Sequence, residues 1–267
     1  MIATASILDE IIANKKREVE ERKQLYPTML LERSLYFETA PVSLSEYLKR
    51  TDRNGIIAEF KRKSPSKGDI NPYADVATTT LGYMQAGASA LSVLTDTKYF
   101  GGKSADLETA RKVNYCPILR KDFIIDEYQV IEAKSIGADA ILLIAAVLSE
   151  DEIASLSKLA ISLGMEVLFE MHDAEELSKF RPEFIAGVNN RNLHDFSVDL
   201  ERSEKFSAGL PEESIKVAES GISSAEDVIR LRQSGFTGFL VGEQFMKQFE
   251  PGKACAKFVS EINALNK

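Results

Sequence analysis

The sequence predicts a closed (β/α)8 barrel with an N-terminal helical extension, and three observations support this fold class. From Ile56 onward, eight short runs rich in apolar and β-branched residues alternate with helical patterns. Four helical runs end at a glycine that leads into the next strand: Gly87, Gly137, Gly164 and Gly235. The first unit lacks the G-x-G-x-x-G spacing of a dinucleotide-binding open sheet. Eight units within about 210 residues fit a closed barrel best.

The alternation gives each barrel element a position in the chain. We expect strands over residues 56–61, 90–95, 117–123, 140–146, 166–171, 184–189, 216–219 and 239–242. We expect helices over residues 74–86, 106–113, 127–136, 150–163, 174–180, 200–206 and 224–233, and a last one after Pro251. Ser149 with Glu152, and Ser223 with Glu226, predict capped starts for two of these helices.

The N-terminal residues predict a long helix that precedes the barrel. Ser6 and Asp9 form a capping-box pattern at its start, and Pro27 ends it. Its apolar residues recur at helical spacing and define one face: Ile7, Leu8, Ile11, Ile12 and Val19. The charged residues of this helix, Lys15 among them, fall outside that face. A second, short helix is expected over residues 43–49.

Length and composition restrict the class of protein. We expect residues 1–267 to form one barrel domain, of which residues 1–50 are the helical extension. With 33 basic and 41 acidic side chains, the net charge of -8 argues against nucleic acid or an anionic membrane as partner. The most apolar run, residues 138–148, has about half the length of a membrane span. We therefore expect a soluble cytoplasmic protein.

Charged residues gather at the carboxyl ends of the expected strands, where barrels of this class place their chemistry. Residues two apart in a strand share a face, so Glu59 and Lys61 point into the barrel and Phe60 points toward the helices. The residues expected at the barrel mouth on this argument are Glu59, Lys61, Lys121, Glu170, Asn189, Arg191 and Glu219.

Each of these charges alone has an ordinary interpretation, since strand-end charges are often solvated and surface ion pairs contribute little. Three carboxylates and three cations at one barrel mouth instead favour a shared site, because such neighbours shift each other's pKa values as acid–base catalysis requires. A Schiff-base role for Lys61 or Lys121 stays open on this reasoning.

Small residues in three loops predict phosphate binding. Ser64 begins a Ser-Pro-Ser-Lys-Gly run after the first strand. Gly221 follows the seventh strand and Gly242 ends the eighth, and these two loops commonly hold a phosphate on backbone N–H groups. A glycine at either place also suits a tight turn alone.

The sequence predicts no metal site. His172 and His194 lie apart without ligand spacing. His172 follows Met171 and could reach the site, but a helix entry beside Asp173 is the favoured place for it. The two cysteines, Cys116 and Cys255, are too few for a disulfide framework or a thiolate zinc site. We expect Cys116 to be a small buried thiol.

Several motifs resemble those of the indole-3-glycerol-phosphate synthase family. They occupy residues 57–68, 92–96, 99–102, 119–123, 137–144, 188–193 and 218–222, and the first helix is also similar. The resemblance covers essentially the whole chain. It implies a carboxy-lyase of tryptophan biosynthesis that closes the indole ring of 1-(2-carboxyphenylamino)-1-deoxyribulose 5-phosphate with loss of CO2 and water.

The resemblance also implies roles for the catalytic residues. Lys121 would be the general acid, Glu170 the base in the dehydration, and Lys61 the group that holds the substrate carboxylate. Supporting residues would orient the lysines and the sugar hydroxyls or act as an ion partner: Glu59, Asn189, Glu219 and Arg191.

Two binding regions follow from the same resemblance. The positions that match its phosphate site are Ser64, Gly221, Gly242 and Glu243, the last through its backbone N–H. The positions that match its pocket for the aromatic ring are Phe100, Phe123, Leu142 and Leu193. Lys103 and Asn192 depart from the Ser and Asp of many relatives, and the chain has no tryptophan to cover the substrate.

The implied reaction needs no cofactor, so we expect none. We expect a monomer that binds a small phosphorylated substrate, with association with other enzymes of the pathway left open. One alternative is the related phosphoribosylanthranilate isomerase family, which uses a Cys and Asp pair, but no cysteine ends the first strand here. Another is a catalytically inactive barrel that binds a phosphorylated ligand, against which the set Lys61, Lys121 and Glu170 argues.

Overall fold

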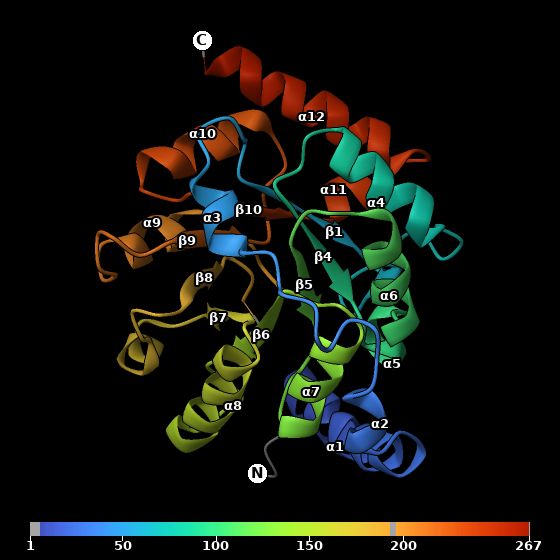
Figure 1. Cartoon of the computed structure of the whole chain (residues 1–267). Helices are drawn as coiled ribbons and strands as arrows, with labels where there is room; N and C mark the ends of the chain where they lie inside the picture. Colours follow the sequence, from blue (N-terminus) through green and yellow to red (C-terminus); the bar gives the residue numbers. More distant parts are fainter. Residues whose placement is uncertain (1–5, 193–195, 267) are drawn as a thin grey trace.

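A computed structural model describes residues 6–192 and 196–266 of the chain. The barrel strands are β1 (Ile56–Phe60), β4 (Ala90–Leu94), β5 (Ile118–Lys121), β6 (Ala140–Ile144), β7 (Glu166–Met171), β8 (Ile185–Asn189), β9 (Lys216–Glu219) and β10 (Gly238–Val241). These eight parallel strands close in the order β1, β10, β9, β8, β7, β6, β5 and β4, and β4 pairs with β1. The predicted barrel is therefore confirmed, with helices surrounding it (Figure 1).

The main helices lie between the strands as the alternation predicts. They are α4 (Val76–Gln85), α6 (Ser104–Val113), α7 (Glu127–Ser135), α8 (Glu150–Ser162), α9 (Glu201–Ser207), α10 (Ala225–Gln233) and α12 (Pro251–Leu265). The glycines that end helical runs all have positive φ, between 78° and 91°, which residues with a Cβ rarely adopt: Gly87, Gly137, Gly164 and Gly235.

Two helix predictions were wrong in detail. The segment Ala174–Lys179 is a 3-10 helix rather than an α-helix, and the chain passes into extended backbone at Phe180, two residues before Pro182. The cap of α10 is Ser224 with Asp227, one residue after the predicted pair, since Asp227 itself accepts from the Ser224 backbone N–H. The box of Ser149 with Glu152 is confirmed.

The loops that follow three of the strands contain short helices or strands. The loop after β1 contains an antiparallel pair, β2 (Lys63–Ser64) and β3 (Gly68–Asp69). A helical turn α5 (Thr97–Phe100) follows β4, and another, α11 (Glu243–Met246), follows β10. Each lies at the carboxyl end of its strand and so builds one rim of the barrel mouth.

Between residues 6 and 50 the chain forms α1 (Ile7–Leu25), α2 (Thr28–Leu31) and α3 (Leu44–Lys49). The predicted capping box of Ser6 and Asp9 starts α1. Figure 1 shows α1 and α2 beside α7, where the Tyr128 hydroxyl donates to the Arg22 and Tyr26 carbonyl oxygens. No helix within residues 6–192 and 196–266 is long and apolar enough to cross a membrane.

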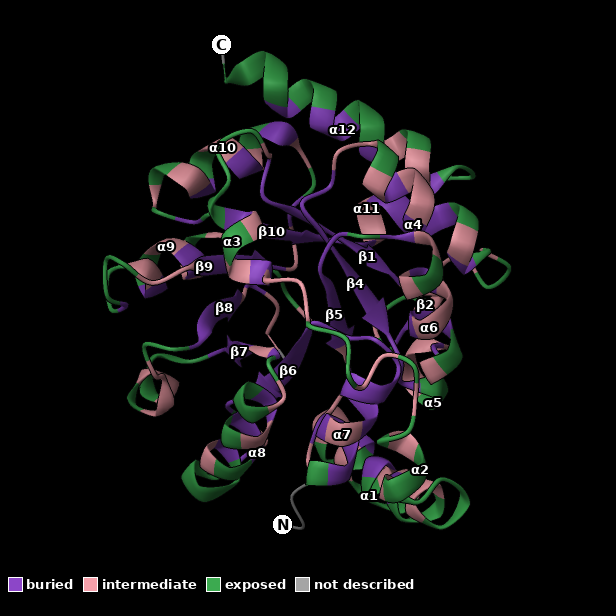
Figure 2. Ribbon diagram, in the orientation of Figure 1, coloured by how far each residue is buried: buried purple, intermediate pink, exposed green. Residues whose placement is uncertain are grey.

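Two apolar layers hold the barrel together, and alternating strand residues contribute to each. In β5, Ile118 packs in the outer layer between strands and helices, whereas Leu119 packs inside the barrel. Leu44 and Leu48 of α3 belong to the inner layer, so α3 covers one end of the barrel. Figure 2 shows the barrel strands mostly buried, and Cys116 is a buried free thiol as expected.

Candidate active site

A cavity opens at the carboxyl ends of the barrel strands. It is lined by every residue that strand parity predicts at the barrel mouth, namely Glu59, Lys61, Lys121, Glu170, Asn189, Arg191 and Glu219. The β8–β9 register places Asn189 beside Glu219, and the β7–β8 register places Glu170 beside Gly187. The parity argument succeeds because each of these residues lies at or just beyond the end of a regular strand.

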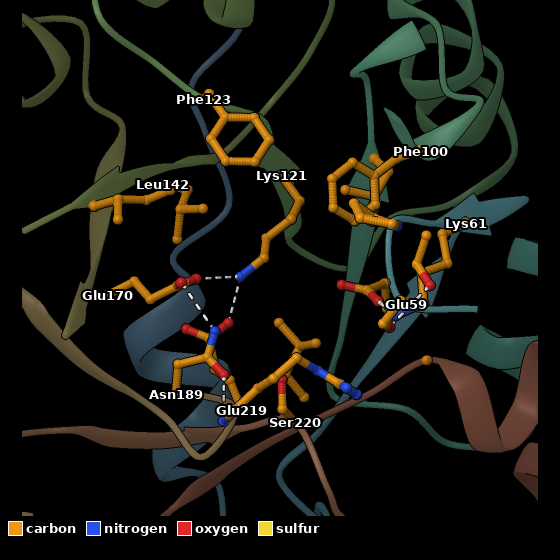
Figure 3. A pocket seen from close by; sticks show the side chains of 18 of the residues that line it. Glu59, Lys61, Phe100, Lys121, Phe123, Leu142, Glu170, Asn189, Glu219 and Ser220 are labelled. Carbon is orange, nitrogen blue, oxygen red and sulfur yellow. Dashed lines mark hydrogen bonds and ion pairs between the residues drawn. The ribbon is translucent and has the colours of Figure 1, made fainter. Parts of the chain in front are cut away.

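Lys121 lies at the centre of this cavity, where Figure 3 shows it pointing between two carboxylates. Its Nζ atom donates to Glu170 Oε2 over 2.7 Å and also pairs with Glu219. Burial alone would lower the pKa of Lys121, but Glu170 and Glu219 outweigh burial and raise that pKa. Lys121 is therefore a protonated acid at neutral pH.

The two carboxylates that share Lys121 differ in their preferred protonation state. Burial would raise the pKa of Glu170, whereas Lys121 and His172 hold that pKa well below its usual range. Burial raises the pKa of Glu219 more than Lys121 lowers it, and the nearby Glu170 adds to the rise. Asn189 Nδ2 donates to Glu170 Oε1 over 2.9 Å and further favours an ionised Glu170. Of the two carboxylates, Glu170 is therefore the one that is ionised and able to act as a base.

A second ion pair lies across the cavity at the end of β1. Lys61 Nζ donates to Glu59 Oε1 over 2.5 Å (Figure 3). Glu59 packs directly against Gly242, where a Cβ atom would lie 2.5 Å from Glu59 Oε1. A glycine at the end of β10 is therefore required for Glu59 to hold its position.

The residues predicted to bind phosphate occupy one side of the cavity. Ser64, Gly242 and Glu243 line it, with Gly242 directly before the first turn of α11. Gly221, which was also predicted here, does not line the cavity, and its neighbour Ser220 does. Gly221 has a φ of 80° and allows the loop to turn at this point. Backbone N–H groups at such a helix start favour an anion.

Apolar side chains form the other side of the cavity. The Phe100 and Phe123 rings lie 6.1 Å apart between centroids, and Leu142 joins them in the lining (Figure 3). Leu193, the fourth residue predicted here, lies outside the described residues. Phe196 also lines the cavity, although the sequence motifs did not single it out. The result is a slot suited to a flat aromatic ring.

The first helix contributes to the cavity, which the sequence analysis did not predict. Ile7, Leu8 and Ile11 line it. The chain contains no tryptophan, so aliphatic side chains of the first helix cover the cavity instead. Lys15, predicted outside the apolar face, is 1% exposed, and its Nζ lies 2.9 Å from Asp122 Oδ1. Helical spacing reveals a face but does not say which element that face meets.

His172 was predicted at a helix entry, yet its side chain lines the cavity and is 4% exposed. Strand parity favours this position, because His172 lies two residues after Glu170 and its side chain therefore points to the same face as that of Glu170. Within the described ranges, no group of three or more His, Cys, Asp or Glu side chains is arranged to hold a metal ion.

Comparison with known proteins identifies the family of this barrel. A family model described as Indole-3-glycerol phosphate synthase matches residues 8–258. The chain belongs to the indole-3-glycerol phosphate synthase family. A relative of that name from Bacteroides thetaiotaomicron is 49% identical over 257 residues, which cover 96% of this chain and 98% of the relative. Another from Salinibacter ruber is 44% identical and covers 96% of both chains.

Solved structures of a different enzyme share the barrel. The tryptophan synthase alpha subunit of Legionella pneumophila aligns with a TM-score of 0.59 at 13% identity, over 83% of this chain and 97% of that one. A mutant alpha subunit from Pyrococcus furiosus gives 0.60 at 16% identity, over 79% of this chain and 98% of its own. At such identity the likeness shows the fold alone.

Proposed function

We propose that this chain is an indole-3-glycerol-phosphate synthase, a carboxy-lyase that closes the indole ring of 1-(2-carboxyphenylamino)-1-deoxyribulose 5-phosphate. The observation that best supports this activity is Lys121 between Glu170 and Glu219 at the mouth of a cavity with one apolar side. The ammonium is an acid, Glu170 is an ionised base, and the slot beside them fits an aromatic ring.

In the first half of the proposed reaction, Lys121 acts as the general acid. It donates a proton to the ketose oxygen while the aromatic carbon that bears the carboxylate attacks the carbonyl carbon. The new carbon–carbon bond closes the five-membered ring, and CO2 leaves with return of its bonding electron pair to the aromatic ring. Lys61, at the end of β1, holds the carboxylate until it departs.

In the second half, Glu170 acts as the base. It removes a proton from the ring CH2 group beside the nitrogen, a proton is returned to the hydroxyl on the neighbouring carbon, which leaves as water, and the new carbon–carbon double bond makes the pyrrole ring aromatic. Asn189 holds Glu170 at Oε1, Glu219 holds Lys121, and Glu59 holds Lys61. These contacts fix the orientation of the acid on β5 and of the base on β7, which lie 2.7 Å apart before the substrate binds.

The remaining residues bind the two ends of the substrate. Ser64, Gly242 and the Glu243 backbone N–H would hold the phosphate, with Gly221 shaping the adjacent loop. Arg191 Nη2 lies 3.9 Å from Glu243 Oε2 and supports this region as an ion partner. The aromatic ring would lie beside the residues of the apolar slot, Phe100, Phe123 and Leu142, with Leu193 as a further predicted member.

An assay for indole fluorescence tests the proposal. We expect the purified chain to convert the carboxyphenylamino substrate to indoleglycerol phosphate and CO2 with a metal chelator present. Phosphoribosylanthranilate in place of the substrate should give no product. A folded protein that forms no indole would contradict the proposed activity. The cytoplasmic location, monomeric state and cofactor independence stay predictions.

A further inference from the structure

His172 is a buried polar side chain that has no role in the reaction steps proposed above. Its side chain is 4% exposed, lines the cavity and places Nε2 3.2 Å from Glu170 Oε1. Neither ring nitrogen has a hydrogen-bond partner among the described residues. A buried imidazole without a partner is costly, and such groups tend to occur where a ligand or a reaction step completes them.

The backbone around His172 is fixed independently of the ring. Its N–H donates to Glu176 Oε2 over 2.6 Å, and Glu176 also accepts from the Asp173 N–H. The segment therefore needs no contact from the imidazole to hold its shape. The ring is available for a task inside the cavity.

The charges that face this ring change during the reaction. Before it, Glu170 contacts Lys121 at Oε2 and Asn189 at Oε1. Once Lys121 has given its proton to the ketose, it is neutral, and Glu170 loses the charge that kept it ionised. The other ionisable groups of the cavity wall are Glu59, Lys61, Asp122, Arg191, Glu219 and Glu243.

We propose that His172 is a positioning residue that acts through Glu170 in the dehydration half of the reaction. A small rotation of the ring would let Nε2–H donate to Glu170 Oε1, 3.2 Å away, and keep that carboxylate ionised and aimed at the substrate after Lys121 has become neutral. This inference rests on the proposed function, because it assigns His172 to one of its two steps. It requires no additional reactant.

The two half-reactions release different products, so they can be followed separately in one turnover. CO2 release reports ring closure and decarboxylation, and indole fluorescence reports dehydration. In His172→Asn and His172→Leu we expect CO2 release at the wild-type rate and indole formation slowed about tenfold or more. In His172→Gln, whose amide nitrogen can reach the place of Nε2, we expect indole formation near the wild-type rate. Glu175→Gln, an exposed change in the same segment, is the matched control.

Each outcome has a distinct meaning. Equal slowing of both products in every His172 variant, or no slowing in any, would overturn the assignment. If one variant does not fold, the contrast between His172→Gln and the remaining variant still decides it. Wild-type protein that forms neither product would instead contradict the proposed function itself.

Discussion

Strand β5 separates two buried clusters of charged residues that have similar composition and different surroundings. The cavity cluster comprises Glu59, Lys61, Lys121, Glu170 and Glu219. The anchor cluster comprises Lys15, Asp96, Arg120, Asp122 and Glu132. Three consecutive residues of one strand end, 120–122, alternate between the two because neighbouring side chains point to opposite faces.

The anchor cluster joins α1 to the barrel. Lys15 Nζ lies 3.0 Å from Asp96 Oδ2 and 2.9 Å from Asp122 Oδ1, so one helical ammonium bridges the loops after β4 and β5. Arg120 Nη2 donates to Glu132 Oε2 over 2.6 Å and reaches α7. Every charge in this cluster meets an opposite one, and the cluster serves to hold α1 over the cavity.

In the cavity cluster, by contrast, some polar atoms have no partner. Glu219 Oε1 and His172 Nδ1 have no hydrogen-bond partner among the described residues, whereas Asp96 Oδ2 of the anchor cluster lies 3.0 Å from the Lys15 ammonium. The comparison teaches that burial of charge does not itself indicate chemistry. What distinguishes the site is an open cavity together with unmatched polar atoms.

The largest expected effect comes from removing the central lysine of the cavity cluster. Lys121→Ala should lower kcat well beyond about 10²-fold, because the ketose oxygen loses its proton donor. The KM should change little. Steady-state rates from indole fluorescence test this, with the exposed Lys112→Ala as control. Comparable rates in Lys121→Ala and wild type would remove Lys121 from its role.

The corresponding lysine of the anchor cluster should act on stability instead. Lys15→Met leaves Asp96 and Asp122 buried without their shared cation, and we expect the free energy of unfolding to fall by about 3–5 kcal/mol. We expect kcat to fall far less than in Lys121→Ala. Urea unfolding measures the difference, with the exposed neighbour Lys16→Met as control. Equal stability of the two variants would show that the bridge does not anchor α1.

The anchor cluster also predicts an acid dependence of stability. Burial alone would raise the pKa of Asp122, but Lys15 and Arg120 hold it well below its usual range. Because the folded pKa lies below the unfolded value of about 3.9, this carboxylate stabilises the fold above that pH. The stabilisation is lost as the pH falls through the folded pKa. Urea unfolding at decreasing pH should therefore show a shallower loss in Lys15→Met than in wild type, and parallel curves would contradict it.

A smaller effect is expected from the contact that fixes Glu59. In Gly242→Ala the new Cβ would lie 2.5 Å from Glu59 Oε1, so Glu59 must move and release Lys61. We expect kcat/KM to fall about tenfold, because small displacements of catalytic groups lower the rate by at least that factor. The φ of Gly242 is −128°, so the alanine does not require a left-handed backbone. Unchanged kcat/KM would show that the position of Glu59 is not critical.

Much of the fold and the core of the site could be predicted from the sequence. Strict alternation of strands and helices fixes a barrel, and the strands over residues 166–171 and 216–219 match the structure to the residue. Parity then placed Glu170 and Glu219 in the cavity, because short regular strands leave a side chain only two directions. The family motifs agreed with this placement.

The rest depended on contacts between distant segments, which local patterns do not specify. Lys15 reads as one charge among many on α1, and its burial follows from Asp96 and Asp122, more than eighty residues away. The lining by Ile7 likewise requires knowledge of where α1 docks. For His172 the less favoured of two predicted places, the cavity, is the observed one, because the strand direction continues for one residue past Met171.

A crystal structure of Lys121→Ala with the carboxyphenylamino substrate tests the central claim most directly. The account predicts intact substrate in the cavity, with its aromatic ring beside Phe100 and Phe123 and its ketose oxygen at the place left by Nζ. The phosphate should lie against Ser64 and the start of α11. Substrate bound elsewhere, or converted to the indole in these crystals, would contradict the assignment of Lys121 as the acid.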